Sequence, residues 1–172
     1  MENKTVIKKN KKVIKRKRGF EIIKESLRKY PLLNIELPVR KTIYSAGYDF
    51  SVPVAISIPP QGKIVVMTDV KAYMLKDEVL KVYIRSSLGV KKGLILMNGT
   101  GVIDSDYYSN KKNDGNIGLP LHNTSNKTIN IAKGDCIAQG IFVKYLITDD
   151  DDTIVKDIRS GGMGSTTKKD IK

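Results

Sequence analysis

Short stretches rich in β-branched and aromatic residues recur along this chain, and turn residues separate them. The stretches span residues 32–37, 48–58, 62–67, 79–84, 93–96, 117–122, 128–131 and 137–145. The turns between them include Pro59-Pro60-Gln61-Gly62, Asn98-Gly99, Asn113-Asp114-Gly115 and Lys133-Gly134-Asp135. Short strands at close spacing with such turns are typical of an all-β sandwich or barrel. No regular alternation of strands with helices is visible, so a parallel α/β sheet is not expected.

The segment 19–30 has a different pattern. Phe20, Ile23 and Leu27 follow one another at helical spacing, and Pro31 ends the run. This spacing predicts a short helix. The run is short, however, and an edge strand fits it equally well.

Size and charge predict three regions in the chain. The 172 residues suffice for one domain of ordinary size. Nine of the 31 Lys and Arg residues fall within residues 1–18, beside a single acidic residue. We therefore predict a basic, disordered tail over 1–18, a β domain over 19–148, and an acidic linker with a glycine-rich C-terminal arm over 149–172. A tail of this kind can also bind nucleic acid or another polyanion weakly, by counterion release.

Composition excludes several other classes of protein. No apolar run is long enough for a transmembrane helix, and the first residues lack the apolar core of a secretory signal peptide. Cys136 is the only cysteine and cannot form an internal disulfide, so we expect a reducing, cytoplasmic setting without membrane contact. Because His122 is the only histidine, a zinc site built from His and Cys within one chain is excluded.

Five stretches carry candidate chemistry. The first, 46–50, contains one carboxylate, Asp49. The second is Arg85-Ser86-Ser87-Leu88-Gly89, in which a cationic fork beside two hydroxyls suits a phosphate group. The fourth, 134–139, places Gln139 on a strand after a turn. The fifth, 159–167, follows Arg159 with three glycines in four positions, which indicates a mobile arm that could close over an anion.

The third stretch, 98–107, has the features of a ligand loop. Its glycines let the backbone approach a ligand closely, and Asn98 offers a donor and an acceptor to a planar base. If the stretch is a strand, Asp104 and Asp106 face opposite sides, so only one of them can enter a given site. A glycine-rich turn explains the same composition when the stretch is taken alone.

Taken together, the five stretches resemble the five motifs of the trimeric dUTPases, in the same order and at matching spacing. The matching patterns, between Leu37 and Thr167, are A-G-Y-D, R-S-S-L-G, N-x-x-G-x-I-D-x-D-Y, G-D-x-I-A-Q and R-x-G-G-x-G-S-T. The resemblance implies an all-β fold, a distorted jelly roll or β-clip barrel of the dUTPase type. It further implies a homotrimer with shared active sites, in which the C-terminal arm of one chain closes over a site between the others. The implied reaction is the hydrolysis of dUTP to dUMP and pyrophosphate with Mg²⁺.

The resemblance also implies a role for each matching residue. Asp104 would be the general base that activates water, and Asp49 would hold Mg²⁺ through a water molecule. The residues that would contact the phosphates are Arg85, Ser86, Ser87, Gln139, Arg159 and Ser165. Those that would contact uracil and deoxyribose are Asn98, Gly101, Val102, Ile103, Tyr107 and Met163.

Three departures from the family pattern stand out. Met163 occupies the position where the family usually has a phenylalanine stacked over uracil, so a ring face is missing there. Thr167 replaces the final glycine of the arm motif. The segment 108–115 is longer than the usual short turn, and a polar surface loop is expected.

Two alternatives stay open beside the dUTPase. The dCTP deaminases share the fold and a similar R-S-S-L-G stretch, but they use a glutamate as proton shuttle. Pro120 stands at that glutamate's position and cannot carry a proton, which disfavours a deaminase. The second alternative is a regulatory or nucleic-acid-binding protein on the same fold. The basic tail and Met163 favour it, whereas the complete set of polar residues in the first four motifs opposes it.

Overall fold

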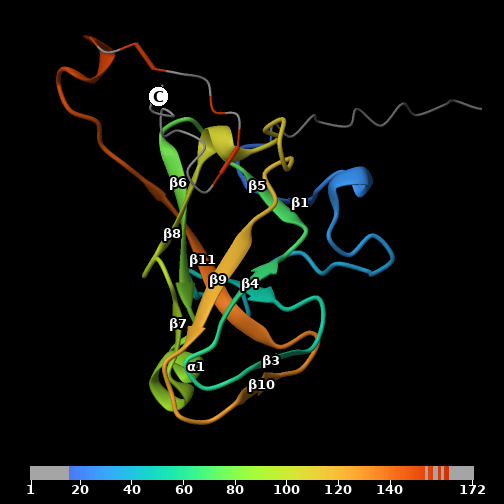
Figure 1. Cartoon of the computed structure of the whole chain (residues 1–172). Helices are drawn as coiled ribbons and strands as arrows, with labels where there is room; N and C mark the ends of the chain where they lie inside the picture. The colour runs from blue at the N-terminus through green and yellow to red at the C-terminus, as the bar shows by residue number, and fades with distance from the viewer. Residues whose placement is uncertain (1–15, 154, 157–158, 160, 163–172) are drawn as a thin grey trace, which may run out of the picture.

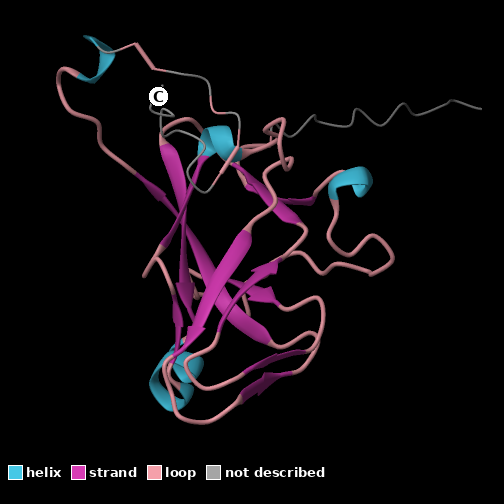
Figure 2. Ribbon diagram, viewed as in Figure 1, coloured by secondary structure: helices cyan, strands magenta, loops and turns pink. Residues whose placement is uncertain are grey.

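The computed structural model describes residues 16–153, 155–156, 159 and 161–162. Strands dominate the described residues (Figures 1 and 2). The strands are β1 (Gly19–Ile22), β2 (Tyr48–Ser51), β3 (Ile56–Ile58), β4 (Lys63–Met67), β5 (Val70–Tyr73), β6 (Glu78–Ile84), β7 (Leu94–Leu96), β8 (Gly101–Asp104), β9 (Gly118–Asn123), β10 (Ile129–Ile131) and β11 (Cys136–Lys144). The helical elements are α1 (Ser86–Lys92) and three 3₁₀ turns, η1 (Glu25–Leu27), η2 (Ser105–Tyr107) and η3 (Asp151–Thr153). The all-β prediction is confirmed.

The strands form a four-stranded sheet in the order β2-β11-β6-β8, a three-stranded sheet β4-β9-β7, and the two pairs β1-β5 and β10-β3. Every strand pair among the described residues is antiparallel. Along β9, buried and half-buried positions alternate, as expected for a strand with one face toward a core. Leu80 of β6, Leu121 of β9 and Ile137 of β11 are fully buried, so one apolar core lies between the sheets.

The helix predicted over 19–30 is wrong for its first part, where the alternative, an edge strand, is confirmed. Residues 19–22 form β1, which pairs with β5, and only the single 3₁₀ turn η1 follows. Phe20 is buried and packs edge-on against Phe50, with 5.5 Å between ring centroids. Ile23 is also buried, whereas Leu27 is 40% exposed. The pairing with β5, which lies some fifty residues away along the chain, decides the conformation.

The predicted strand stretches need further correction: one of them is not a strand, and β5, β8 and α1 are not among them, although 98–107 was considered as a possible strand. The stretch 32–37 is not a strand; it lies between Pro31 and Pro38, and Leu32 is 96% exposed. Strand β5 was not predicted, because Lys71 interrupts its apolar residues. Helix α1 was not predicted either. It ends at Gly93, whose φ of 69° lets its N–H bond back to the carbonyl of Gly89.

Most of the predicted basic tail lies outside the described residues, but its last arginines contact the domain. Arg18 pairs with Glu78, which is buried at the start of β6. Arg16 pairs with Glu21 at 2.7 Å and lies over the ring of Tyr73. No helix in the described part of the chain is both long and apolar enough to cross a membrane.

A buried acid, Asp114, makes the fold sensitive to low pH. Burial alone would raise the pKa of Asp114, but hydrogen bonds from Lys71 Nζ and the backbone N–H of Lys24, both at 2.8 Å, hold it below its usual value. A lowered pKa means that the pair stabilises the fold above the ordinary aspartate pKa of about 4, and that this stability is lost as the pH falls through the lower, folded value. We therefore expect the melting temperature to decrease when the pH is lowered beyond about 4.

The variant Asp114→Asn isolates this contribution, since Glu21 and Glu78 also have lowered pKa values. Thermal melts of both proteins from pH 7 to pH 3 should show a lower melting temperature for the variant at pH 7. The two curves should converge on acidification. Parallel curves over the whole range would contradict the role of Asp114.

Candidate active site

A pocket of about 210 Å³ lies between β8 and β9, where the C-terminal segment returns to the domain. Its lining residues are Asn98, Gly101, Val102, Ile103, Asp104, Tyr107, Gly118, Pro120, Arg159 and Gly162. Seven of the predicted site residues therefore share this one pocket. Gly118, Pro120 and Gly162 were not predicted as site residues. Gly162 belongs to the glycine arm, and Pro120 stands at the position of the deaminases' catalytic glutamate, but the sequence gives no signal for Gly118.

Asp104 is the last residue of β8, and its side chain is half exposed. Arg159 bridges two acids, since its Nη2 pairs with Asp104 and its Nε donates to Asp106 Oδ1 at 2.7 Å. Both acids thus reach the same arginine, although a strand through both positions would have separated them. The reason is that β8 ends at Asp104 and η2 begins at once, which breaks the strand alternation.

The resemblance assigned the arm to a site between other chains, whereas here Arg159 contacts Asp104 of its own chain. The other predicted arm residues, Met163 and Ser165, lie outside the described residues. Of the three predicted arm residues, only Arg159 belongs to the described part of the chain, and its predicted contact with phosphate stays a prediction.

The Tyr107 ring forms one wall of the pocket and is held by its hydroxyl. The hydroxyl donates to the carbonyl oxygen of Asn116 at 2.8 Å and accepts from Asn113 Nδ2 at 2.7 Å. The backbone of Gly162 lies on the ring, and a Cβ at this position would come within 2.7 Å of Tyr107 Cε2. A glycine is therefore required for this close approach.

The opposite wall is formed by β8 and the turn before it. Asn98 is exposed in the turn after β7, where Gly99 adopts a φ of 67°. A Cβ on Gly101 would lie 3.1 Å from Val82 Cβ, so glycine lets β8 lie close to β6. The side-chain amide of Asn98 and the backbone of residues 101–103 therefore line the pocket on this wall.

Pro120 lines the pocket from β9, although β9 is the middle strand of its sheet. Its carbonyl oxygen accepts from the backbone N–H of Met97 at 2.8 Å. The N and O atoms of one strand residue point to the same side, so the missing N–H of Pro120 faces the turn after β7 and not β4. The proline consequently removes no hydrogen bond between β9 and β4, and it places an apolar surface at the pocket.

The remaining predicted residues form a second cluster. Asp49 of β2 and Gln139 of β11 are cross-strand neighbours. Arg85 directly follows β6, and its Nη2 lies 3.7 Å from Asp49 Oδ2. A Cβ on Gly47 would lie 2.5 Å from Gln139 Oε1, so Gly47 and the Gln139 side chain lie close together. Exposed Ser86 and Ser87 begin α1 beside this cluster.

The two clusters lie at opposite ends of β6. Asp104 pairs with Val79 near the start of β6, whereas Arg85 follows its last residue. Six residues of strand at about 3.3 Å each separate the two levels by roughly 20 Å. Figure 1 shows the same separation, with α1 at one end of the long sheet and the C-terminal segment at the other. One chain therefore does not bring its own Asp104 and Arg85 together.

No group of three or more His, Cys, Asp or Glu side chains within the described ranges could by itself hold a metal ion. Asp49 is the only carboxylate that the second cluster contributes, and its side chain is 9% exposed. Mg²⁺ usually binds through one or two carboxylates, several waters and the phosphates of a substrate. The donor set at Asp49 fits that mode and does not fit a dedicated metal cage.

Comparison with known proteins identifies the family. The dUTPase family model matches residues 34–167. The deoxyuridine 5'-triphosphate nucleotidohydrolase of Lactococcus lactis is 42% identical over 149 residues, which cover 87% of this chain and 97% of that protein. The corresponding protein of Debaryomyces hansenii is 35% identical, over 78% of this chain and 82% of its own length.

Solved structures agree with this result. The crystal structure of a dUTPase from Streptococcus mutans is 40% identical and superposes with a TM-score of 0.66, over 76% of this chain and 98% of that one. The dUTPase of Staphylococcus aureus phage phi11 shares the fold at 22% identity, with a TM-score of 0.63 over 78% of this chain and 94% of that one. The predicted jelly roll of the dUTPase type is confirmed, and the chain belongs to the dUTPase family.

Proposed function

We propose that this chain is a dUTP diphosphatase whose active site combines residues of several copies in a homotrimer. It hydrolyses dUTP to dUMP and pyrophosphate. The proposal of a shared site is based on one observation, the position of Asp104 and Arg85 at opposite ends of β6. Each lies in a dUTPase motif, and one chain cannot present both to the same triphosphate. The relatives named as dUTP nucleotidohydrolases support the reaction.

Asp104 is the general base in this proposal. Its half-exposed carboxylate faces the pocket and can take a proton from a water molecule that attacks the α-phosphorus of dUTP. A positioned base of this kind contributes about 10²–10⁴-fold to a rate. In the structure, the Asp104 carboxylate accepts a hydrogen bond from the Arg159 guanidinium. A triphosphate offers this arginine a stronger anionic partner, and its transfer to the γ-phosphate would free Asp104 for the water.

The second cluster neutralises the phosphates. The Arg85 guanidinium can donate two parallel hydrogen bonds to a phosphate group, and the hydroxyls of Ser86 and Ser87 can donate further ones. Gln139 adds an amide from the neighbouring strand. Asp49 would hold a water of the Mg²⁺ ion, which when bound offsets negative charge on the triphosphate.

In this proposal the pocket recognises the base and the sugar of dUTP. Asn98 and the backbone of residues 101–103 can pair with the edge of uracil, and cytosine would leave buried groups unpaired because its donor and acceptor pattern differs. The ring of Tyr107 would lie under the deoxyribose, where it leaves no room for a 2′-hydroxyl. Met163 and Ser165 would complete the arm over the base and the phosphates.

Exposed apolar side chains support assembly from several copies. Tyr44 and Leu146 are each 96% exposed, and Ile43 is 80% exposed. Val102, at the pocket itself, is 59% exposed. Apolar surface beside a site is typical of an interface, and a cyclic arrangement of identical chains gives each site the same composition.

Parallel assays of pyrophosphate release from dUTP, dTTP, dCTP and UTP test this function. Rapid turnover of dUTP alone is expected, together with a solution mass of about three times 19.2 kDa by light scattering. Absence of turnover with all four nucleotides, combined with salt-sensitive retention on DNA, would instead indicate the nucleic-acid-binding alternative. That result would also give the basic tail its role.

A further inference from the structure

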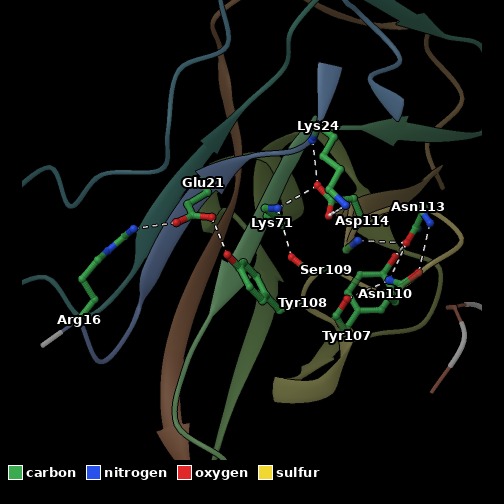
Figure 3. A network of polar contacts seen from close by, with 11 residues as sticks. Arg16, Glu21, Lys24, Lys71, Tyr107, Tyr108, Ser109, Asn110, Asn113 and Asp114 are labelled. Carbon is green, nitrogen blue, oxygen red and sulfur yellow. Dashed lines mark hydrogen bonds and ion pairs between the residues drawn. The ribbon is translucent and has the colours of Figure 1, made fainter. Parts of the chain in front are cut away.

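A buried ion pair outside the pocket fastens the long loop 108–116 to β5. Lys71 Nζ lies 2.8 Å from Asp114 Oδ2, and the backbone N–H of Lys24 donates to the same oxygen at 2.8 Å. Asp114 is fully buried and Lys71 is 6% exposed. Figure 3 shows Lys71 pointing between Asp114 and Ser109, to which it also donates at 3.2 Å. One lysine thus holds both ends of the loop.

The pair also fixes the backbone of the loop. Asp114 has a φ of 55° and Gly115 a φ of 86°, so the chain turns sharply after the buried carboxylate. A Cβ on Gly115 would lie 2.8 Å from the carbonyl oxygen of Tyr107. The end of the loop is therefore folded directly against the residue that forms the pocket wall.

Asparagines of the same loop hold Tyr107 from two sides. Asn110 Nδ2 donates to the Tyr107 carbonyl oxygen at 2.8 Å and to Asn113 Oδ1 at 2.7 Å. Asn113 Nδ2 donates to the Tyr107 hydroxyl, which donates in turn to the carbonyl oxygen of Asn116. In Figure 3 Asn110 and Asn113 lie beside the Tyr107 ring, and Lys71 and Asp114 lie close by. The backbone N–H of Asp114 donates to the carbonyl oxygen of Asn110 at 3.0 Å, and this bond links the ion pair to the residues that hold the ring.

We propose that Lys71 and Asp114 are positioning residues for Tyr107, and that through this ring they set how strongly the enzyme prefers dUTP to UTP. The proposal rests on the proposed function. Neither residue lines the pocket. A displacement of about 1 Å at a reacting site can change a rate a hundredfold, so a small shift of the ring suffices to admit a 2′-hydroxyl. A buried charge left without its partner provides the force for such a shift.

Two variants test the proposal. Asp114→Asn keeps the shape, and asparagine tolerates the positive φ, but the charge opposite Lys71 is lost. Asn113→Ala removes the bond to the Tyr107 hydroxyl at a half-exposed position, where folding is less at risk. The matched control is Asp77→Asn, which removes a carboxylate that pairs with Lys144 on the surface at 2.7 Å. For each protein, kcat and KM are measured with dUTP and with UTP, well below its melting temperature.

Both variants are expected to lower the ratio of kcat/KM for dUTP to kcat/KM for UTP by about tenfold or more. The change should come mainly from a higher KM for dUTP and a higher activity toward UTP. The control should keep the wild-type ratio. A merely structural role would lower the melting temperature and the active fraction but leave the ratio unchanged. That result in Asp114→Asn, or in Asn113→Ala if Asp114→Asn does not fold, would overturn the proposal. Wild-type enzyme that hydrolyses neither nucleotide would overturn the proposed function, whereas a selective wild type with equally selective variants would overturn this inference alone.

Discussion

Replacing Asp104 by asparagine should lower kcat for dUTP by at least about 10²–10⁴-fold, because the carboxamide cannot take a proton from water. The side chain keeps its size, and its partner Arg159 is half-buried at the surface, so the fold and the assembly should persist. Steady-state assays of pyrophosphate release, with light scattering on the same sample, measure both properties.

Asp106→Asn is the matched control, since Asp106 contacts the same arginine but belongs to η2 and does not line the pocket. Its effect on kcat should be much smaller. Near-normal turnover in Asp104→Asn would remove Asp104 as the base, and an equal loss in both variants would show that the common partner, Arg159, carries the effect.

The second large effect is expected for Arg85→Ala. Loss of one preorganised group that stabilises developing charge typically lowers kcat by about 10²–10³-fold. Arg85→Lys should recover only part of this loss, because an ammonium group keeps the charge without the two parallel donors. Full activity in Arg85→Ala, measured at saturating dUTP and Mg²⁺, would contradict the role of the second cluster in binding phosphate.

The sequence predicts the fold well where the spacing of turn residues and apolar residues along the chain is enough to define a strand. The turn Lys133-Gly134-Asp135 separates two predicted strands that are observed as β10 and β11, and the alternation in β9 matches its buried face. The motif residues Asn98, Asp104, Tyr107 and Arg159 do share one pocket, although they come from separate elements. The grouping of Asn98, Asp104 and Tyr107 could be predicted, because one motif of the resemblance contains all three. The place of Arg159 beside Asp104 of the same chain could not, because the resemblance assigns the arm to a site between other chains.

The parts that could not be predicted depend on contacts between distant residues. Phe20 and Ile23 lie at helical spacing, but pairing with β5 makes residues 19–22 a strand. Lys71 is a charge within β5, and its burial makes sense only beside Asp114, 43 residues further along the chain. No local pattern reveals such a pair, because the desolvation of one charge is offset only by the other.

The separation of the site into two clusters is likewise invisible in the sequence. Motif order does not show that Asp104 and Arg85 stand at opposite ends of one strand. The ladder between β6 and β8 shows it directly, because Asp104 is paired with Val79. The shared site was therefore only an implication of the resemblance, and the register of one sheet now supports it.

Subunit mixing tests the shared site most directly. The two inactive variants, Asp104→Asn and Arg85→Ala, are co-expressed with different affinity tags, and the mixed assemblies are purified through both tags and assayed with dUTP. If each site takes Asp104 from one chain and Arg85 from its neighbour, every mixed trimer holds one restored site among its three, so about a third of the sites are restored. We expect activity near that fraction of wild type, far above either parent. A mixture no more active than its parents would contradict a site built across chains.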